Sequence, residues 1–398
     1  MFGSERTARL TLLVVLALGL SLALPSAALA ASHGMRVGSV YVMSNETANT
    51  VIQFQRDAKG RLWDGGTFMT GGAGTGAGLG SQGALVRSHD GKWLFAVNAG
   101  SDELSVFSIG ERGHLRLVSR ASTVGSMPVS VTVSGRLAYV LNGGGSGSIA
   151  GFRVSTKGHL TYIPGSAQPL SNLGVGAAPV AEQIGFKPWG DTLVVTEKST
   201  NMIDVYGLTS GVAGPPVTFV SNVAAPYGFG FSKAGILVIS EAGINALSSY
   251  AVVPTMLSVI SPSVVDAGLA PCWVVVSPDG RYVYTSDAHS NDVSIYRLMP
   301  DGTLTVKTSP AVTVATPLDL DTAHNGRFLF VLSAGSHQVA RFGVRAGGAL
   351  AGLGSFGTLP ASATGLVAWW VQPHEGGTRL ALGSCRIAHH ATHEGPGS

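Results

Sequence analysis

One unit of about 45 to 50 residues repeats along this chain of 398 residues, and it limits the possible folds more than any other feature. Each copy contains a glycine followed at once by a short apolar segment. These glycines are Gly38, Gly91, Gly135, Gly190, Gly235, Gly280 and Gly326. Apolar segments rich in β-branched and aromatic residues that follow a turn glycine are typical of β-strands. Seven such strands predict seven copies of one structural unit.

Two further markers complete the unit. A Gly-x-Leu turn, as in Gly113–Leu115, lies between two alternating segments, which is the pattern of a β-hairpin. An X-Pro step, as in Ala270-Pro271, precedes another short apolar segment, and proline is suited to the start of a strand because it has no N–H. Each unit therefore holds four strands. We predict an all-β, seven-bladed β-propeller of four-stranded antiparallel blades.

The first unit begins at its second strand, so its inner strand must come from elsewhere. The segment that starts at Gly365 follows the last hairpin, and we predict that it completes the first blade, so that the N- and C-terminal strands share one sheet. The segment from Gly377 resembles a second strand once more and either pairs elsewhere or competes with the N-terminal strand. We assign residues 31–385 to the propeller and 386–398 to a disordered tail.

Residues 1–30 have the pattern of a secretory signal peptide. Arg6 and Arg9 precede the apolar run Leu10–Leu24, and Ala28–Ala30 supplies small residues for cleavage. The run is shorter than the roughly twenty residues that a membrane-spanning helix needs. We expect a secreted or periplasmic protein without a membrane span after cleavage; a retained anchor is the alternative.

Composition excludes one class of partner. Charged residues make up 12% of the chain, the formal net charge is +3, and the basic residues are scattered, so we expect no nucleic-acid binding. The two cysteines, Cys272 and Cys385, either pair in an oxidising compartment or stay unpaired.

A polar residue stands near the end of the second strand in every unit, and these residues form our candidate site. We predict catalytic roles for Glu197 and Glu241. The candidate substrate-binding residues are Asn45, Asn98, Asn142, Asp287, His289 and Ser333. The structural alternative is that Asn, Asp and Ser end strands because their side chains bond to the local backbone.

Three acids of this set, Glu197, Glu241 and Asp287, lie on consecutive units and so could share one pocket. Such a trio suits a divalent cation, which prefers oxygen ligands, or a carboxylate with a raised pKa that acts as a base. We predict no other cofactor. Residues 78–83 match the G-x-G-x-x-G pattern, but no helix follows, and we interpret Gly71–Gly83 as a flexible loop between blades.

The segments Ser88–Phe107 and Ser277–Leu304 resemble blades of the lactonase-like seven-bladed propellers, the family of bacterial 6-phosphogluconolactonase and fungal carboxymuconate cyclising enzymes. This resemblance covers the mature chain and implies the propeller fold and chemistry on a lactone. The catalytic signature of that family resembles Gly-Pro-Arg-His followed by Asn-Glu. This sequence has Ala178–Ala181 and Glu197-Lys198 instead, and only Asn45-Glu46 keeps the pair, in another blade.

Two functions follow as hypotheses. The first is an exported lactonase-like propeller, a lactone hydrolase or a binding protein for a lactone- or sugar-like molecule, with its site at the mouth of the central channel. The alternative is a non-catalytic scaffold that binds a protein partner or a surface through loops such as Gly71–Gly83 and Gly143–Ser148. A polar pocket with convergent acids favours the first, and an apolar patch of loops favours the second.

Overall fold

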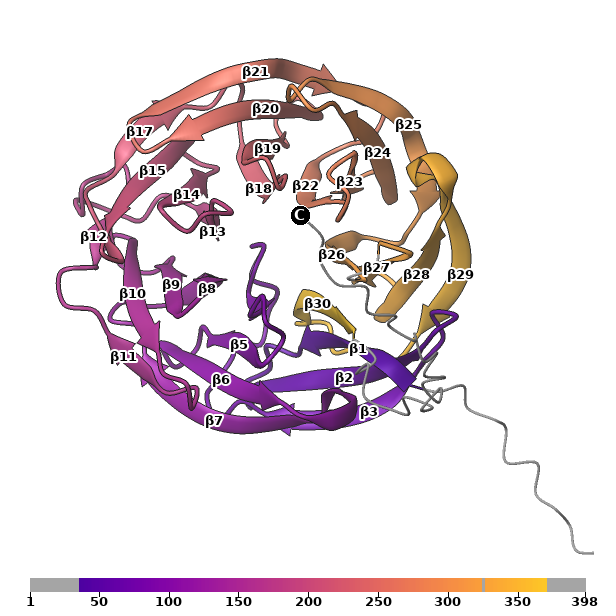
Figure 1. The fold of residues 1–398 in the computed structure, drawn as a ribbon, viewed down its shortest axis with the longest axis horizontal. Coiled ribbons are helices and arrows are strands. Elements are labelled where there is room, and N and C mark those ends of the chain that lie inside the picture. Colours follow the sequence, from indigo (N-terminus) through magenta and orange to yellow (C-terminus); the bar gives the residue numbers. More distant parts are fainter. Residues whose placement is uncertain (1–35, 324–325, 371–398) are drawn as a thin grey trace, which may run out of the picture. The chain divides into compact units, whose positions relative to one another are not determined.

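The structure is a computed structural model in which residues 36–323 and 326–370 are described. These residues form seven small antiparallel sheets arranged in a ring, which confirms the predicted seven-bladed propeller (Figure 1). Besides strands they contain two short 3-10 turns, η1 (Glu111–Gly113) and η2 (Ala346–Gly348). None of their helical segments has the length and hydrophobicity to cross a bilayer. The predictions for residues 1–30, for Cys385 and for the segments after 370 concern parts of the chain outside these ranges.

The blades follow one another in chain order, and each runs from an inner strand beside the central axis to an outer strand at the rim. The first blade comprises β30 (Thr364–Trp370), β1 (Arg36–Met43), β2 (Thr50–Asp57) and β3 (Leu62–Met69). The second comprises β4 (Leu85–Arg87), β5 (Trp93–Asn98), β6 (Glu103–Ile109) and β7 (Leu115–Ser122). The third comprises β8 (Pro128–Ser134), β9 (Leu137–Asn142), β10 (Ser148–Val154), β11 (Leu160–Tyr162) and β12 (Gln168–Pro169). The fourth comprises β13 (Ala181–Phe186), β14 (Thr192–Glu197), β15 (Met202–Thr209), β16 (Val212–Ala213) and β17 (Val217–Val220).

The remaining three blades have four strands each. The fifth comprises β18 (Pro226–Phe231), β19 (Ile236–Glu241), β20 (Ala246–Val253) and β21 (Met256–Val265). The sixth comprises β22 (Pro271–Val276), β23 (Tyr282–Asp287), β24 (Asp292–Leu298) and β25 (Leu304–Thr313). The seventh comprises β26 (Pro317–Thr322), β27 (Phe328–Ser333), β28 (Gln338–Val344) and β29 (Leu350–Phe356).

The ring closes as the sequence predicts. Strand β30 pairs antiparallel with β1, and Val42 lies opposite Leu366 in the register. The last strand of the chain therefore supplies the inner strand of the first blade. This pairing gives the first blade its fourth strand and joins both ends of the described chain within one sheet.

The core lies between neighbouring blades, which pack face to face. Between the fourth and fifth blades, for example, Val194 and Val205 of one blade pack in the same cluster as Leu237, Ile239 and Tyr250 of the other. Because the second strand of a blade is covered on both faces, its sequence is almost continuously apolar. This double burial explains why the second strands were the clearest sequence signal.

The two faces of the ring carry different loops. Because strands alternate in direction, the turns from first to second and from third to fourth strand lie on one face, which we call the turn face. The ends of the second strands and the connections between blades lie on the other, which we call the tip face. The inner strands run from the tip face to the turn face.

A repeated hydrogen bond holds the start of the inner strands. Asn245, in the loop after the second strand of the fifth blade, accepts from the backbone N–H of Ala270 at 2.9 Å. Ala270 precedes Pro271 and has a left-handed φ of 57°, and Asn245 has a φ of 59°. The same bond recurs at 2.6 to 2.8 Å in three other blades, from Met127 to Asp102, from Ala225 to Asn201 and from Thr316 to Asn291. The X-Pro steps are thus anchored to the preceding blade.

Candidate functional site

The seven strand-end residues of the candidate site are buried. Asn45, Asn98, Asn142, Glu197, Glu241 and Asp287 are fully inaccessible, and Ser333 is 2% exposed, whereas His289 is exposed. Their side chains form hydrogen bonds with residues of their own blades and of the loops that connect neighbouring blades. None of the eight lines the channel cavity described below. Their roles in catalysis and substrate binding stay predictions.

Glu197 and Glu241 each accept several hydrogen bonds. Glu197 accepts from the backbone N–H of Ser171 at 3.0 Å and from the hydroxyl of Thr200 at 2.5 Å. Glu241 accepts from the Tyr250 hydroxyl at 2.8 Å and from Ser248 at 2.5 Å. Burial raises the pKa of Glu241 above its ordinary value, and the hydroxyl donors partly oppose that shift. Through Ser171, and through the Ser221 hydroxyl, which donates to Glu241 at 3.1 Å, the two carboxylates each tie a second strand to the connection that arrives from the preceding blade.

The other members of the set have similar local partners. Asp287 accepts from the Ser294 hydroxyl at 2.6 Å, and burial together with Asp266 raises its pKa to about 9. The amide and hydroxyl side chains bond as follows: Asn45 to Thr75, Asn98 to Ser105 and Asn49, Asn142 to Thr123 and Ser148, and Ser333 to Ala315. In the described part of the chain, no group of three or more His, Cys, Asp or Glu side chains could hold a metal ion.

The loop between β3 and β4 enters the middle of the ring (Figure 1). Its last residues, Gly80–Gly83, which we call the plug, bond to inner strands of several blades. The indole N–H of Trp273 donates to the carbonyl of Ser81 at 3.0 Å, and the Tyr227 hydroxyl donates to that of Gly80. Ser81 itself is 1% exposed. The sequence suggested a contact surface for this loop, but its final turn lies inside the channel.

The plug also joins inner strands at their tip-face ends. The backbone N–H of Gln82 donates to the carbonyl of Glu182 at 3.0 Å, and the Ser130 hydroxyl donates to the carbonyl of Gln82 at 2.7 Å. The backbone N–H of Val131 donates to the carbonyl of Gly83 at 2.8 Å. Glu182 lies near the upstream end of β13, and Ser130 and Val131 lie in the upstream and central parts of β8, so the plug crosses the channel on its tip-face side.

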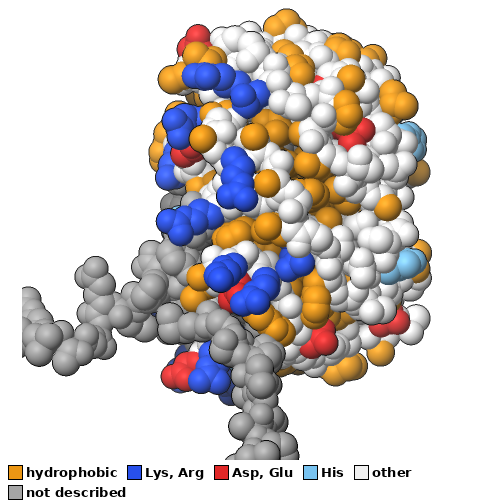
Figure 2. Space-filling view, turned by 90° about the vertical axis from the view of Figure 1, so that its right-hand side faces the viewer, with side chains coloured by type: hydrophobic (Ala, Val, Ile, Leu, Met, Phe, Trp, Pro, Cys, Tyr) orange, Lys and Arg blue, Asp and Glu red, His pale blue; other side chains and the backbone are white. Residues whose placement is uncertain are grey.

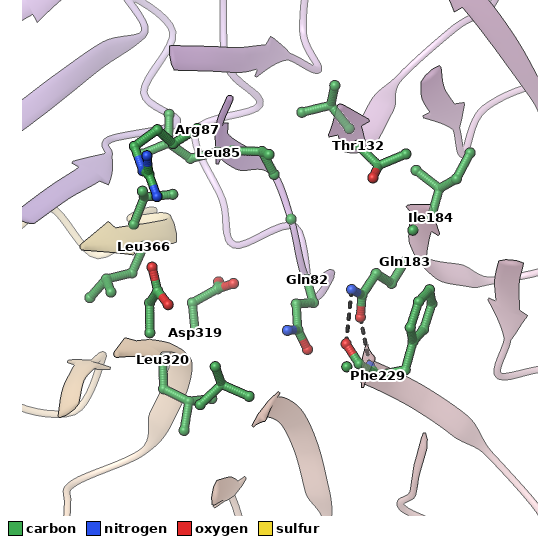
Figure 3. Close-up of a pocket in the computed structure, with 18 of the residues that line it drawn as sticks. Gln82, Leu85, Arg87, Thr132, Gln183, Ile184, Phe229, Asp319, Leu320 and Leu366 are labelled. Atoms are coloured by element: carbon green, nitrogen blue, oxygen red, sulfur yellow. Dashed lines mark hydrogen bonds between the residues drawn. The ribbon is translucent and has the colours of Figure 1, made fainter. Parts of the chain in front are cut away.

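A cavity of about 350 Å³ occupies the channel on the turn-face side of the plug. Residues of the inner strands surround it, as Figure 3 shows. Its apolar wall includes Phe186, Phe229 and Phe231. Its polar side chains are Gln82, Arg87, Thr132, Gln183, Asp319 and Asp321. A cavity with an apolar wall and a few polar groups is the usual form of a small-molecule site.

The two aspartates of β26 lie against the adjacent strand β30. Asp319 accepts from the backbone N–H of Gly365 at 2.9 Å, and Asp321 accepts from that of Ala368 at 2.9 Å. Burial raises the pKa of Asp319 to about 7 and that of Asp321 to about 6, although these backbone donors favour the charged forms. Asp319 therefore changes its charge near neutral pH.

Arg87 brings a positive charge to the same cavity. Burial lowers its pKa, and the nearby Asp321 partly offsets this by favouring the charged guanidinium. Its Nη1 donates to the carbonyl of Ser88 at 3.1 Å, while its buried Nε has no acceptor among the described residues. A buried donor without an acceptor costs free energy, so the Arg87 side chain is held in the cavity wall at an energetic cost.

The sequence analysis missed this cavity, although one signal was present. The inner strand β26 reads Leu318–Thr322 with aspartate at alternate positions, whereas the inner strand β22 is almost wholly apolar. Two acids on a strand at the axis indicate a polar channel. The sequence of the plug gave no comparable signal, because a Gly-rich loop does not indicate which part of the fold it contacts.

A second group of ionisable side chains lies beside the plug. Glu182 forms an ion pair with Lys198 at 2.6 Å, and the Lys198 ammonium lies 5.0 Å from the ring centre of Tyr227. Burial raises the pKa of Glu182 to about 7 despite the ammonium. Lys198 occupies the position where the resembled catalytic signature has glutamate. In this chain that position therefore carries a cation whose partner is Glu182.

Comparison with known proteins identifies the family. The sequence model of the family described as lactonase, seven-bladed β-propeller, matches residues 35–169 and 245–362, which is more than half of the chain. The chain is similar to the periplasmic gluconolactonase PpgL of Pseudomonas aeruginosa, with 17% identity, a TM-score of 0.68, and coverage of 84% of this chain and 100% of that one.

It is also similar to a candidate 6-phosphogluconolactonase of Bacteroides fragilis, with 19% identity, a TM-score of 0.63, and coverage of 83% of this chain and 98% of that one. At such identities these structures support the fold alone. The family match and the seven closed blades lead to one conclusion: the chain belongs to the seven-bladed β-propeller lactonase family.

Proposed function

We propose that this chain binds a small polar lactone in the channel cavity and hydrolyses it there. The observation that carries the proposal is the cavity of about 350 Å³ whose wall brings together Asp319, Asp321 and Arg87. A carboxylate to activate water and a cation to stabilise a developing oxyanion are the two groups that ester hydrolysis needs. The lactonase family and the gluconolactonase and 6-phosphogluconolactonase neighbours support a lactone as substrate.

In this mechanism Asp319 acts as the general base. Its carboxylate takes a proton from a water molecule as the water oxygen attacks the lactone carbonyl carbon. The carbonyl oxygen gains negative charge and bonds to the Arg87 guanidinium. The ring C–O bond then breaks, the protonated Asp319 returns the proton to the leaving alkoxide, and the product is the open hydroxy acid.

The position of the plug supports substrate access to the channel cavity from one face of the ring. Because Gly80–Gly83 crosses the channel near the tip face, the substrate reaches the cavity from the turn face. The cavity would then be a closed-ended pocket whose floor is Gln82, which restricts it to small molecules. This places the proposed reaction on the side of the plug opposite Glu197 and Glu241.

A lactone panel tests the proposal, with the purified mature chain, Asp319→Asn, Glu197→Ala and Glu241→Ala assayed below their unfolding temperatures. Loss of a general base lowers turnover by about 10²–10⁴-fold, and we expect that loss for Asp319→Asn. Circular dichroism checks that each variant is folded. Equal turnover in wild type and folded Asp319→Asn would remove Asp319 from the mechanism, and selective loss in Glu197→Ala or Glu241→Ala would place the base at the strand ends.

Export is part of the proposal and rests on the signal-peptide pattern of residues 1–30. We expect the protein from the exported fraction to begin at Ala31. Intact mass and N-terminal sequencing measure this directly. An uncleaved chain in the membrane fraction would favour the retained anchor instead.

A scaffold function is the second candidate, and exposed apolar side chains on the tip face favour it. Leu173 and Val175, in the connection between the third and fourth blades, are 70% and 76% exposed. Such side chains suit contact with a protein partner. A Leu173→Ser/Val175→Ser variant tests this: a partner that co-purifies with the wild type and is lost from the variant supports it, and unchanged co-purification refutes it.

A further inference from the structure

The channel cavity has two chemically different halves. Its charged side chains, Arg87, Asp319 and Asp321, come from β4 of the second blade and β26 of the seventh. Strand β30 of the first blade lies between these two strands, so the charges occupy one side of the channel. In a ring of seven blades, the fourth and fifth lie opposite the first. Figure 3 shows Arg87 and Asp319 on one side of the cavity and Phe229 on the other.

The opposite half is aromatic. The described residues of β8, β13, β18 and β22 that line the cavity include no charged side chain. Phe186 and Phe231 lie at the turn-face ends of β13 and β18 and are partly exposed, whereas Phe229 is 2% exposed. Phe186 and Phe231 therefore form most of the aromatic surface that a ligand in the cavity can contact.

This aromatic wall is held in place by its own packing. The rings of Phe229 and Phe231 meet edge to face with their centres 5.9 Å apart, and Phe186 meets Tyr139 in the same way at 5.9 Å. A Cβ at Gly185 would come within 2.5 Å of the Phe229 ring, so glycine is needed there for that ring to lie against β13. Edge-to-face contacts favour one arrangement of the rings, so the wall is formed before a ligand binds.

The polar side chains beside the aromatic wall are already engaged. Gln183 bonds to the backbone of Phe229 through both its amide nitrogen and its amide oxygen. The Thr132 hydroxyl oxygen accepts from the backbone N–H of Phe186 at 3.1 Å. A ligand hydroxyl placed against Phe186 and Phe231 would therefore find few side-chain partners, and burying a polar group without a partner costs free energy.

Charge is disfavoured in the same half of the cavity. An anionic group against the phenyl rings would lose its hydration without gaining a cation. A cationic group would first pass the turn face, where the turns carry exposed lysines such as Lys92, Lys157 and Lys233. Figure 2, which views the ring from the side of β25, β28 and β29, shows Lys and Arg side chains gathered along one edge of the ring and sparse along the other. Like charges repel, so such an edge disfavours a cationic ligand.

We propose that the preferred substrate is a lactone whose ring carries a short, uncharged hydrocarbon substituent. This inference rests on the proposed function and narrows it. The polar lactone ring lies against Asp319 and Arg87, and the substituent lies against Phe186 and Phe231, which are then the specificity-determining residues. Each methylene group that the wall removes from water should strengthen binding by about fourfold. The cavity of about 350 Å³ keeps the substituent short.

Binding of three hydrolysis-resistant δ-lactams to the mature chain, measured by ligand-detected NMR titration, tests this preference. The three are the unsubstituted δ-lactam, the same ring with one n-propyl group, and the polyhydroxylated gluconolactam. We expect the propyl lactam to bind at least about tenfold more tightly than the unsubstituted one, because three further carbons are buried. Gluconolactam should bind no more tightly than the unsubstituted lactam.

A pair of variants separates the wall from general stability. Phe231→Ala should weaken binding of the propyl lactam by at least about fivefold and leave the unsubstituted lactam within about twofold, because only the substituent contacts the wall. The matched control is Phe219→Ala, since Phe219 packs against the same core cluster as Phe231 but does not line the cavity. Its affinities for all three lactams should stay at the wild-type values. Circular dichroism checks that both variants are folded.

The outcomes distinguish this inference from the proposed hydrolysis. Tighter binding of gluconolactam than of the propyl lactam, or equal weakening by Phe231→Ala and Phe219→Ala, would overturn the inference and leave the hydrolysis standing. Preference for the propyl lactam in a chain that hydrolyses no lactone would support the apolar half of the cavity and remove the reaction. If none of the three lactams binds, the channel cavity is not the lactone site and the inference is refuted with it.

Discussion

The side-chain amide of Gln82 is paired with the backbone of Val274 in both directions, although the two residues lie 192 positions apart. Its Nε2 donates to the carbonyl of Val274 at 2.7 Å, and its Oε1 accepts from the Val274 N–H at 3.0 Å. Gln183 does the same for Phe229, at 3.1 and 2.7 Å. The innermost strand of a blade has a free edge, and these amides satisfy that edge as a neighbouring strand would.

This pairing predicts a stability cost for Gln82→Ala. The substitution leaves the backbone N–H and carbonyl of Val274 without partners in the channel, so the free energy of unfolding should fall by about 1–3 kcal/mol. Denaturant unfolding measures it. Gln183→Ala should cost a similar amount, because it leaves the backbone N–H and carbonyl of Phe229 without these partners. An unchanged unfolding midpoint for Gln82→Ala would show that these two hydrogen bonds do not stabilise the fold.

The hydrogen bond from the backbone N–H of Ala270 to the side chain of Asn245 predicts a second effect on stability. Asn245→Ala removes the acceptor of the Ala270 N–H and puts alanine at a left-handed φ, so we expect a loss of about 1–3 kcal/mol. Asn245→Asp keeps the acceptor oxygen and should retain most of the stability. Thermal unfolding of the two variants compares them. Equal losses would mean that the hydrogen bond has no part in fixing the step.

The repeat made the ring predictable, because each blade reuses one pattern. Turn glycines such as Gly91 and Gly280, and X-Pro steps such as Ala270-Pro271, mark local backbone geometry that the chain must adopt wherever it occurs. The closing strand β30 was also predictable, since the first blade lacked an inner strand. The turns and X-Pro steps depend on local sequence, and the closing strand follows from counting the strands of each unit.

The site was harder to predict, because it depends on contacts between distant segments. Nothing near Gln82 in the sequence indicates that it bonds to Val274, and Arg87 meets Asp321 only because the ring closes. The strand-end acids were visible in the sequence, but their partners, such as Tyr250 for Glu241, were not. Polar residues at repeated positions in the sequence show where the second strands end. Which side chains they contact depends on how the blades pack in three dimensions.

The buried Asp287 predicts a pH dependence of stability. Its pKa is raised from 3.8 to about 9, mainly by burial and next by the nearby Asp266, so the folded state holds a proton that the unfolded state releases. Its stabilising contribution is therefore complete below about pH 4 and is lost as the pH rises towards about 9. The unfolding temperature of the wild type should fall between about pH 5 and about pH 9.

Asp287→Asn, which mimics the neutral carboxyl, should make that fall shallower. The matched control is Asp301→Asn, in an exposed turn where backbone and side-chain hydrogen bonds lower the pKa of Asp301. It should leave the slope unchanged, because Asp301 is ionised in both states over this range. Parallel slopes for wild type and Asp287→Asn would contradict the raised pKa.

The proposed base predicts a pH–rate profile. Burial raises the pKa of Asp319 to about 7, and only its ionised form can accept a proton from water. The value of kcat/KM for the hydrolysed lactone should rise with pH up to about 7 and then level off. Folded Asp319→Asn should lack this limb, and Asp301→Asn should retain it. A wild-type profile that is flat from about pH 5 to about pH 9 would contradict Asp319 as the base.

The position of a bound ligand tests the proposed site most directly. A crystal structure of the mature chain with a hydrolysis-resistant lactam analogue should show the ligand in the channel cavity, with polar atoms within about 2.6–3.2 Å of Asp319 and Arg87. A ligand on the tip face between Glu197 and Glu241, with the channel cavity vacant, would contradict it.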